Sequence, residues 1–142
     1  MIVNQIAVFI ENKKGMLYEL TSVLGRAGVD LVALSIADTH DFGIVRLITK
    51  DNALAIKTLK EAGFTAAAAD LLGVEVEDKP NGLAEMLKTL EEGGIDIEYL
   101  YSFSRSHNGK AMILLKVDDT DKAAGIIDQG KIETIKSLSA DE

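Results

Sequence analysis

The chain has 142 residues, 47% of them hydrophobic, which is enough to bury the core of one compact domain or of two small ones. It contains no cysteine, which excludes disulfides, zinc–thiolate sites and thiol nucleophiles. A formal net charge of -8 argues against nucleic acid and anionic membranes as partners, because both attract clustered Lys and Arg. No apolar run approaches the roughly 18 residues of a membrane span, and no secretory leader is recognisable, so we expect a cytoplasmic protein.

Hydropathy patterns in the first half of the chain predict four strands and two helices. Residues 2–10 alternate between apolar and polar side chains, as a half-buried strand does. Leu17, Leu20 and Leu24 then form the apolar stripe of a helix that ends at Gly28. The remaining elements are predicted as strands at 30–38 and 44–49, a helix at 53–62 and a weak strand at 64–68.

The second half of the chain repeats the first at an offset of 66 residues. The aligned pairs include Glu11 with Glu77, Lys13 with Lys79, Leu17 with Leu83, Gly28 with Gly94, Asp30 with Asp96 and Gly43 with Gly109. One inserted residue near Asp118 is expected to shift the offset to 67, so that Gly63 meets Gly130. The repeat predicts strands at 71–77, 95–104, 111–117 and 132–138, and helices at 83–93 and 121–129.

The predicted fold class is α+β, with two ferredoxin-like βαββαβ units side by side, residues 1–69 and 70–142. Each unit is expected to be an antiparallel four-stranded sheet with two helices on one face. No Pro-, Gly- or Ser-rich spacer separates Ala69 from Asp70, so we expect the units to dock rigidly about an approximate two-fold axis.

The loop before the first helix of each copy has residues suited to binding a small zwitterion. Gly15 lets the backbone approach a ligand closely, and the free N–H groups of the first helical turn attract a carboxylate. Asn12 and Asp78 offer side-chain acceptors for an ammonium group. In the alternative interpretation, Gly15 and Asn81 are simple N-caps, and Asn12 and Asp78 are ordinary turn residues.

The same loops carry a family resemblance. The first copy has Asn-Lys-Lys-Gly-Met-Leu at 12–17 and Gly-Val-Asp-Leu at 28–31. The second copy has Asp-Lys-Pro-Asn-Gly-Leu at 78–83 and Gly-Ile-Asp-Ile at 94–97. Two such motifs in register resemble the signature of ACT domains, and the resemblance covers nearly the whole chain.

The resemblance implies where ligands bind, because amino acids in this family commonly sit where two ACT units meet. The loop of one unit then faces the start of the second strand of its neighbour. One implied site consists of Asn12, Gly15, Met16, Leu17 and Asp96. Its pseudo-symmetric counterpart consists of Asp78, Asn81, Gly82, Leu83 and Asp30.

The two loops depart from the family pattern in different ways. The first has Lys14 in place of proline but keeps the glycine. The second keeps Pro80, but its glycine comes one residue late, at Gly82. The first loop is therefore expected to bind more reliably than the second.

The function that the resemblance implies is a non-catalytic regulatory protein that binds a small amino acid and needs no cofactor or metal. The alternative is a ligand-free interaction module that docks a metabolic enzyme. His40 and His107 lie at a predicted turn without an accompanying cluster of metal ligands, so turn residues are the simpler interpretation. An RNA-recognition domain shares the strand order but places aromatics where IVRLIT and AMILLKV have none.

Three aromatic residues of the second copy predict a contact surface. Tyr99, Tyr101 and Phe103 share a parity, so all three point to one face of their strand. If Leu100 faces the helices, these aromatics lie on the open face of the sheet, where a homodimer would bury them. In the alternative, strand twist or a bulge turns them into the core.

Overall fold

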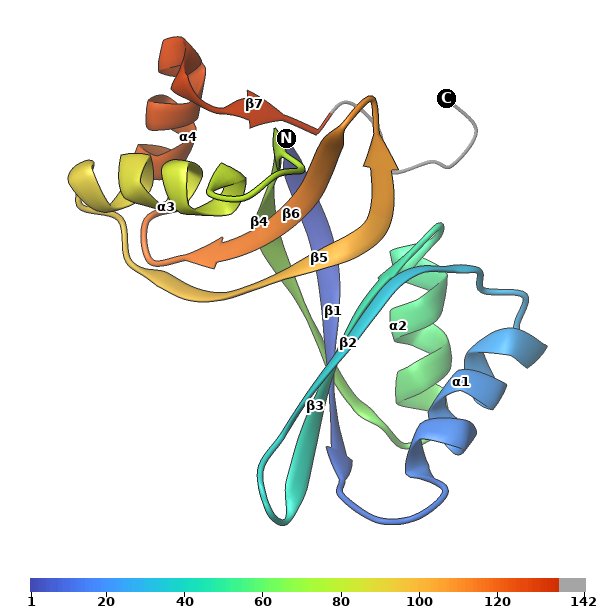
Figure 1. Cartoon of the computed structure of the whole chain (residues 1–142). Coiled ribbons are helices and arrows are strands. Elements are labelled where there is room, and N and C mark those ends of the chain that lie inside the picture. Colours follow the sequence, from blue (N-terminus) through green and yellow to red (C-terminus); the bar gives the residue numbers. More distant parts are fainter. Residues whose placement is uncertain (136–142) are drawn as a thin grey trace. The chain divides into compact units, whose positions relative to one another are not determined.

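The computed structural model describes residues 1–135, with the side chains at 103–107 and 131 left outside the description (Figure 1). The chain divides into two compact units. The N-terminal unit is Asn4–Ala69, and the C-terminal unit runs from Asp70 onward and includes Met1–Val3. The first three residues join the C-terminal unit because the backbone N–H of Gly73 donates to the carbonyl oxygen of Met1 at 2.8 Å.

The N-terminal unit has the predicted βαββαβ order. Its elements are β1 (Ile2–Glu11), α1 (Met16–Arg26), β2 (Leu31–Asp38), β3 (Phe42–Thr49), α2 (Asn52–Glu61) and the first part of β4 (Thr65–Glu77). The strands lie in the order β2-β3-β1-β4, with β3 antiparallel to both of its neighbours. Figure 1 shows α1 and α2 side by side against this sheet.

The core of the N-terminal unit follows from the predicted apolar faces. Leu20 and Leu24 of α1 are fully buried against Ile6 and Val8 of β1, in one hydrophobic cluster. The helix ends as predicted at Gly28, whose φ of 77° is left-handed, and the N–H of Val29 then donates to Leu24 O at 3.0 Å.

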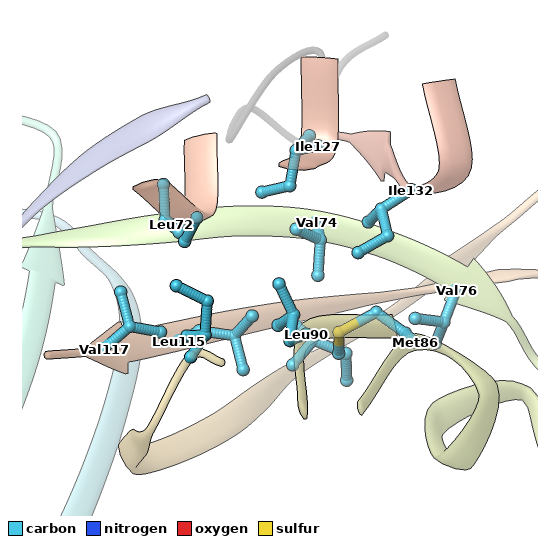
Figure 2. Close-up of a cluster of buried hydrophobic side chains, with 12 residues drawn as sticks. Leu72, Val74, Val76, Met86, Leu90, Leu115, Val117, Ile127 and Ile132 are labelled. Carbon is cyan, nitrogen blue, oxygen red and sulfur yellow. The ribbon is translucent and has the colours of Figure 1, made fainter. Parts of the chain in front are cut away.

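The C-terminal unit has the same architecture. Its elements are the rest of β4, α3 (Gly82–Glu92), β5 (Ile97–His107), β6 (Lys110–Val117), α4 (Thr120–Ile126), the π-helical turn η1 (Ile127–Lys131) and β7 (Glu133–Thr134). The strands lie in the order β5-β6-β4, and β7 pairs with β4. In the core of this unit, Met86 and Leu90 of α3 face Val74 of β4 and Leu115 of β6 (Figure 2). Both units therefore confirm the ferredoxin-like fold.

The two separate strands predicted at 64–68 and 71–77 are one continuous strand, β4, over Thr65–Glu77. The boundary between the units, Ala69–Asp70, lies inside it. The segment contains no proline, and its only glycine, Gly73, is buried within the ladder, so nothing breaks the extended backbone.

The ungapped repeat register through Gly43 and Gly109 is wrong. Leu34 pairs with Leu47 and Leu100 with Leu115, so the offset is 66 residues on the first strand of the hairpin and 68 on the second. The two extra residues lengthen the β5–β6 hairpin. It closes with Asn-Gly at 108–109, where φ is 54° and 73°, the left-handed pair that a tight hairpin turn requires.

The two tyrosines of β5 lie opposite the helical face. Leu100 packs against the core of the C-terminal unit, so Tyr99 and Tyr101, one residue to either side, point away from that core. Both tyrosines are half-buried. The side chain of Phe103 lies outside the described residues.

Candidate functional site

The loop before α1 is held by the backbone in a left-handed turn. Gly15 has φ 89° and ψ -10°, and no side chain caps the helix after it. The N–H of Met16 donates to Lys13 O at 3.3 Å, and the N–H of Asn12 donates to Asp41 O at 2.9 Å. The first turn of α1 therefore begins with N–H groups that no capping side chain covers.

The loop before α3 has the same conformation. Asn81 takes the place of Gly15, with φ 70° and ψ -5°, and again no side chain caps the helix. The N–H of Gly82 donates to Lys79 O at 3.0 Å, and the N–H of Asp78 donates to Gly109 O at 2.8 Å. Asparagine is one of the few residues besides glycine that tolerates this backbone. The late glycine, Gly82, therefore does not distort the second loop.

Asn12 is oriented by the neighbouring hairpin. Its Nδ2 donates to the carbonyl oxygens of Thr39 at 3.3 Å and His40 at 3.4 Å, both in the β2–β3 turn. These bonds use the donor end of the amide and leave Oδ1 as the acceptor end. His40 thus contributes its backbone to the loop. Asp78, the counterpart of Asn12, has no side-chain N–H and cannot make these bonds.

The aspartates that open the second strands differ in their partners. Asp30 pairs through Oδ2 with Lys50 Nζ at 3.2 Å, and both side chains are about two-thirds exposed. Asp96 lies at the matching position, and its backbone N–H donates to Asp118 Oδ1 at 3.0 Å. Among the side chains that the structure describes, no Lys or Arg forms an ion pair with the Asp96 carboxylate. Asp96 is therefore the aspartate better able to receive an ammonium group.

One unit alone cannot bring its own loop and its own aspartate to a small ligand. Asn12 precedes α1 and Asp30 follows it, and a helix of 11 residues separates its ends by about 16 Å. The same holds for Asp78, α3 and Asp96. A site that combines a loop with an aspartate needs two units, so the predicted combination of Asn12 with Asp96 remains a prediction.

Residues 1–140 match the family described as the ACT domain pair. The chain belongs to this family. It is also similar to a protein from Bacteroides thetaiotaomicron of known crystal structure, with 36% sequence identity and a TM-score of 0.87 over 95% of this chain and 92% of that one. No curated protein matches the sequence.

More distant structures share the fold of this ACT domain pair. The regulatory subunit of aspartate kinase from Thermus thermophilus, in its ligand-free form, has 16% identity and a TM-score of 0.60 over 89% of this chain and 91% of that one. The regulatory subunit from Thermus flavus has 17% identity and a TM-score of 0.61, over 89% and 90%. The family assignment and these neighbours confirm the ACT resemblance.

The described part of this ACT domain pair lacks two further kinds of feature. Within the described residues, no group of three or more His, Asp and Glu side chains is arranged to hold a metal ion. Over the same part of the chain, no helix has the length and apolarity to cross a membrane.

The second loop of the ACT domain pair depends on Gly82 for packing. A Cβ added to Gly82 would overlap the carbonyl oxygen of Glu77 at the end of β4. We expect Gly82→Ala to lower the free energy of unfolding by about 1–3 kcal/mol in urea denaturation, because backbone must move to admit the methyl group. Gly125→Ala in α4 is the control, since a Cβ there meets nothing within 4 Å. Equal effects of the two substitutions would refute this account.

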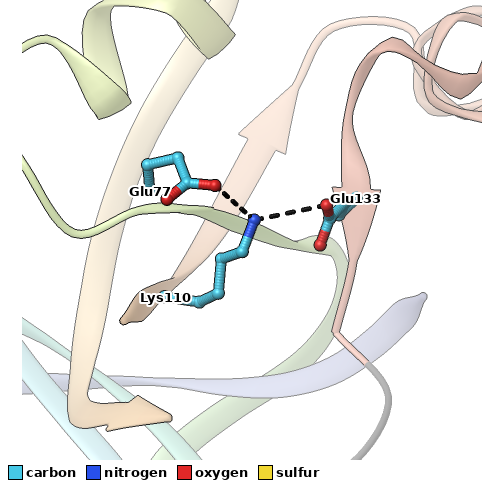
Figure 3. A network of polar contacts seen from close by, with 3 residues as sticks. All are labelled: Glu77, Lys110 and Glu133. Carbon is cyan, nitrogen blue, oxygen red and sulfur yellow. Dashed lines mark hydrogen bonds and ion pairs between the residues drawn. The ribbon is translucent and has the colours of Figure 1, made fainter. Parts of the chain in front are cut away.

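Lys110 joins β6 to both β4 and β7 of the ACT domain pair. Its Nζ contacts Glu77 Oε1 at 2.7 Å and Glu133 Oε1 at 3.2 Å, as Figure 3 shows. The hydrogen bond from Lys110, aided by the lysine charge, lowers the pKa of Glu77 below its ordinary value of 4.5. Hydrogen bonds to Glu77 and Glu133 raise the pKa of Lys110 above its ordinary 10.5.

The Lys110 network predicts a pH dependence of stability. Because the pKa of Glu77 is lower in the folded state, its stabilising contribution is complete above pH 4.5 and is lost as pH falls below that value. The contribution of Lys110 is complete below pH 10.5 and is lost as pH rises further. Lys110→Met should therefore lose less stability than the natural protein between about pH 6 and about pH 3 in urea titrations. Parallel pH profiles would contradict the assignment.

Proposed function

We propose that this chain is a non-catalytic regulatory protein that binds a small amino acid where two ACT units meet. The observation that carries the proposal is the shared loop conformation. A left-handed residue, Gly15 or Asn81, precedes a helix whose first turn has no side-chain cap. Such a turn offers backbone N–H groups to a carboxylate.

In the first site, the ligand carboxylate meets the N–H groups of Met16 and Leu17, and the Met16 N–H exchanges its 3.3 Å bond to Lys13 O for the ligand. The ammonium group is received by Asn12 Oδ1 and by Asp96 from another unit. Support comes from the orientation of Asn12 by the β2–β3 turn. It comes also from Asp96, which has no cationic partner among the described side chains. A charge-assisted hydrogen bond of this kind contributes about 1.5–3 kcal/mol.

The second site, with Asp78, Asn81, Gly82, Leu83 and Asp30, is proposed to bind more weakly. Its loop has the same backbone as the first, so the difference lies in the partners of the aspartates. Asp30 already pairs with Lys50, and a ligand ammonium must compete with that lysine.

The test of amino-acid binding is a thermal-shift screen of the standard amino acids against the full chain. A ligand present at about 100 times its dissociation constant stabilises the folded state by about 2.7 kcal/mol. A shift with one amino acid or a small group of them supports the proposal. No shift with any of them would refute it.

A second candidate function is a ligand-free module that docks a metabolic enzyme, and exposed aromatics favour it. Phe9 of β1 and Phe42 of β3 are 50% and 62% exposed. Two large apolar side chains with this much exposed surface, on adjoining strands, are suited to a protein contact. The regulatory-subunit names of the Thermus neighbours support an enzyme as the partner. The thermal-shift screen separates the two candidates, because only the first requires an amino acid.

We further propose that the chain forms a homodimer that buries Tyr99, Tyr101 and Phe103. The support is the direction of the two described tyrosines, which point away from the core of the C-terminal unit. Sedimentation should give a dimer at micromolar concentration, and Tyr101→Glu should shift it to a monomer. A monomeric natural protein would contradict the assembly.

A further inference from the structure

The aspartates before β2 and β5 each lie beside the residue that follows the next strand of the hairpin. In the N-terminal unit, the backbone N–H of Lys50 donates to the carbonyl oxygen of Asp30 at 3.0 Å. In the C-terminal unit, the backbone N–H of Asp118 donates to the carbonyl oxygen of Asp96 at 3.0 Å. Lys50 and Asp118 therefore occupy equivalent positions, each next to the aspartate of a proposed amino-acid site.

The next residue of each unit supports this equivalence. Asp51 caps α2 by accepting the N–H of Leu54 at 3.1 Å, and Asp119 caps α4 by accepting the N–H of Lys122 at 3.0 Å. The two caps have the same alignment offset, 68 residues, that strand pairing gives for β3 and β6. The backbone therefore follows the same course in both units, while the side chains at the preceding position differ.

Those two side chains have opposite charges and act differently on the neighbouring aspartate. Lys50 Nζ lies 3.2 Å from Asp30 Oδ2 and pairs with that carboxylate. Asp118 instead accepts the backbone N–H of Asp96 through Oδ1 at 3.0 Å, which a lysine cannot do because its side chain has no acceptor. The turn into β5 is therefore held without a cation, and the Asp96 carboxylate stays open to one.

A different lysine of the C-terminal unit lies nearby but does not replace Lys50. Lys122 Nζ lies 3.1 Å from the position that a Cβ on Gly94 would take, just after α3. At the C-terminal end of a helix, a positive charge is attracted by the exposed carbonyl groups. Among the side chains that the structure describes, Lys122 forms no ion pair with Asp96. Asp96 therefore lacks the counter-ion that Asp30 has.

We propose that Lys50 and Asp118 determine the order in which the two amino-acid sites fill. This inference rests on the proposed function and adds its dependence on amino-acid concentration. At the site of Asp30, the ligand ammonium must displace Lys50 and is repelled by its charge. At the site of Asp96, the neighbouring side chain is negative and attracts the ammonium. The site of Asp96 therefore fills first, and the site of Asp30 fills only at higher concentration.

The size of the expected effect follows from the exposure of the ion pair. The side chains of Lys50 and Asp30 are each 65% exposed, so water screens their attraction. An exposed pair of this kind changes an equilibrium constant by about two- to five-fold. Lys50→Met should therefore strengthen binding at the site of Asp30 about two- to five-fold. Lys50→Asp reverses the charge and should strengthen it roughly ten-fold.

Two-dimensional ¹H–¹⁵N NMR of the full chain, with each standard amino acid added in turn, reports the two loops separately. In the natural protein, we expect the amide signals of Met16 and Leu17 to shift at lower amino-acid concentration than those of Gly82 and Leu83, whose loop joins the site of Asp30. Both substitutions of the lysine that pairs with this aspartate should lower the concentration at which Gly82 and Leu83 respond, and the charge reversal should lower it further.

Two more variants separate a local charge effect from a change of structure. Asp118→Asn keeps an acceptor for the Asp96 N–H but removes the charge, so the first pair of amides should respond at about two- to five-fold higher concentration. Lys88→Met is the matched control, because it removes a similarly exposed lysine from an ion pair with Glu92 and leaves both aspartates as they are. It should leave the responses of both loops unchanged.

Equal responses of the two loops in the natural protein, or equal effects of Lys50→Asp and Lys88→Met, would overturn this proposal and leave amino-acid binding intact. If no standard amino acid shifts the amides of either loop, in the natural protein or in Lys50→Asp, the proposed function fails and the filling order fails with it. The two failures are therefore distinguishable in one set of spectra.

Discussion

Truncating Leu90 to alanine is expected to lower the free energy of unfolding by about 2–5 kcal/mol. Leu90 is 0% exposed and packs from α3 onto the sheet of the C-terminal unit (Figure 2). Removing its isobutyl group loses burial and leaves a cavity that close-packed neighbours fill only in part. Leu24, also 0% exposed, is its counterpart on α1, and Leu24→Ala should have an effect of the same size.

Urea denaturation measures both leucine variants, with Lys88→Ala as the control. Lys88 lies on the exposed face of α3, and its side chain is 66% exposed, so its truncation should change stability by less than about 0.5 kcal/mol. Native-state hydrogen exchange shows in which unit each substitution lowers the protection of backbone amides. If each leucine variant lowers protection only in its own unit, the two units open separately. A loss below about 1 kcal/mol in both variants would mean that these helices are packed differently.

Removing either ammonium acceptor of the first amino-acid site is expected to weaken ligand binding by roughly ten-fold or more. Asn12→Ala deletes the amide oxygen, and Asp96→Ala deletes the formal negative charge. The second substitution should cost at least as much as the first, because a charged acceptor binds an ammonium group more strongly than a neutral one. Isothermal titration with the amino acid found in the screen measures both.

Asp78→Ala and Asp30→Ala are the matched variants of the second site. We expect smaller losses from them, because Asp30 is already paired with Lys50. Equal losses at Asn12 and Asp78 would mean that both sites bind with similar affinity. Unchanged affinity in both Asn12→Ala and Asp96→Ala would place the ligand elsewhere on the protein.

Most of the fold could be predicted because each element signals itself locally. The stripe of Leu17, Leu20 and Leu24 places a helix, and the structure has α1 over Met16–Arg26. The errors arose where local signals were weak or overlooked. The alanine-rich start of β4 has little hydropathy contrast, so one strand was predicted as two. Asn108-Gly109 is the strongest short-range sequence signal for a hairpin turn, but the ungapped repeat alignment does not take this turn into account.

Some residues of the candidate sites could also be predicted from local sequence, and others could not. The loop residues Asn12 and Gly15 were predictable because motif and backbone conformation lie in one short segment. The ion-pair network of Lys110 with Glu77 and Glu133 could not be predicted, because its three side chains come from strands far apart in the sequence. A pairing of a loop with an aspartate depends on how units associate, which no local pattern encodes.

The unbroken course of β4 affects how the protein can be dissected in the laboratory. A protease needs several residues of exposed, unpaired backbone, and Ala69–Asp70 lies within a strand. Limited digestion should therefore cut elsewhere before it separates the halves. Expressing either half alone would truncate a strand that both halves use and would expose an unpaired ladder, which favours aggregation. The two copies of the repeat are therefore inseparable as reagents, although each has its own core.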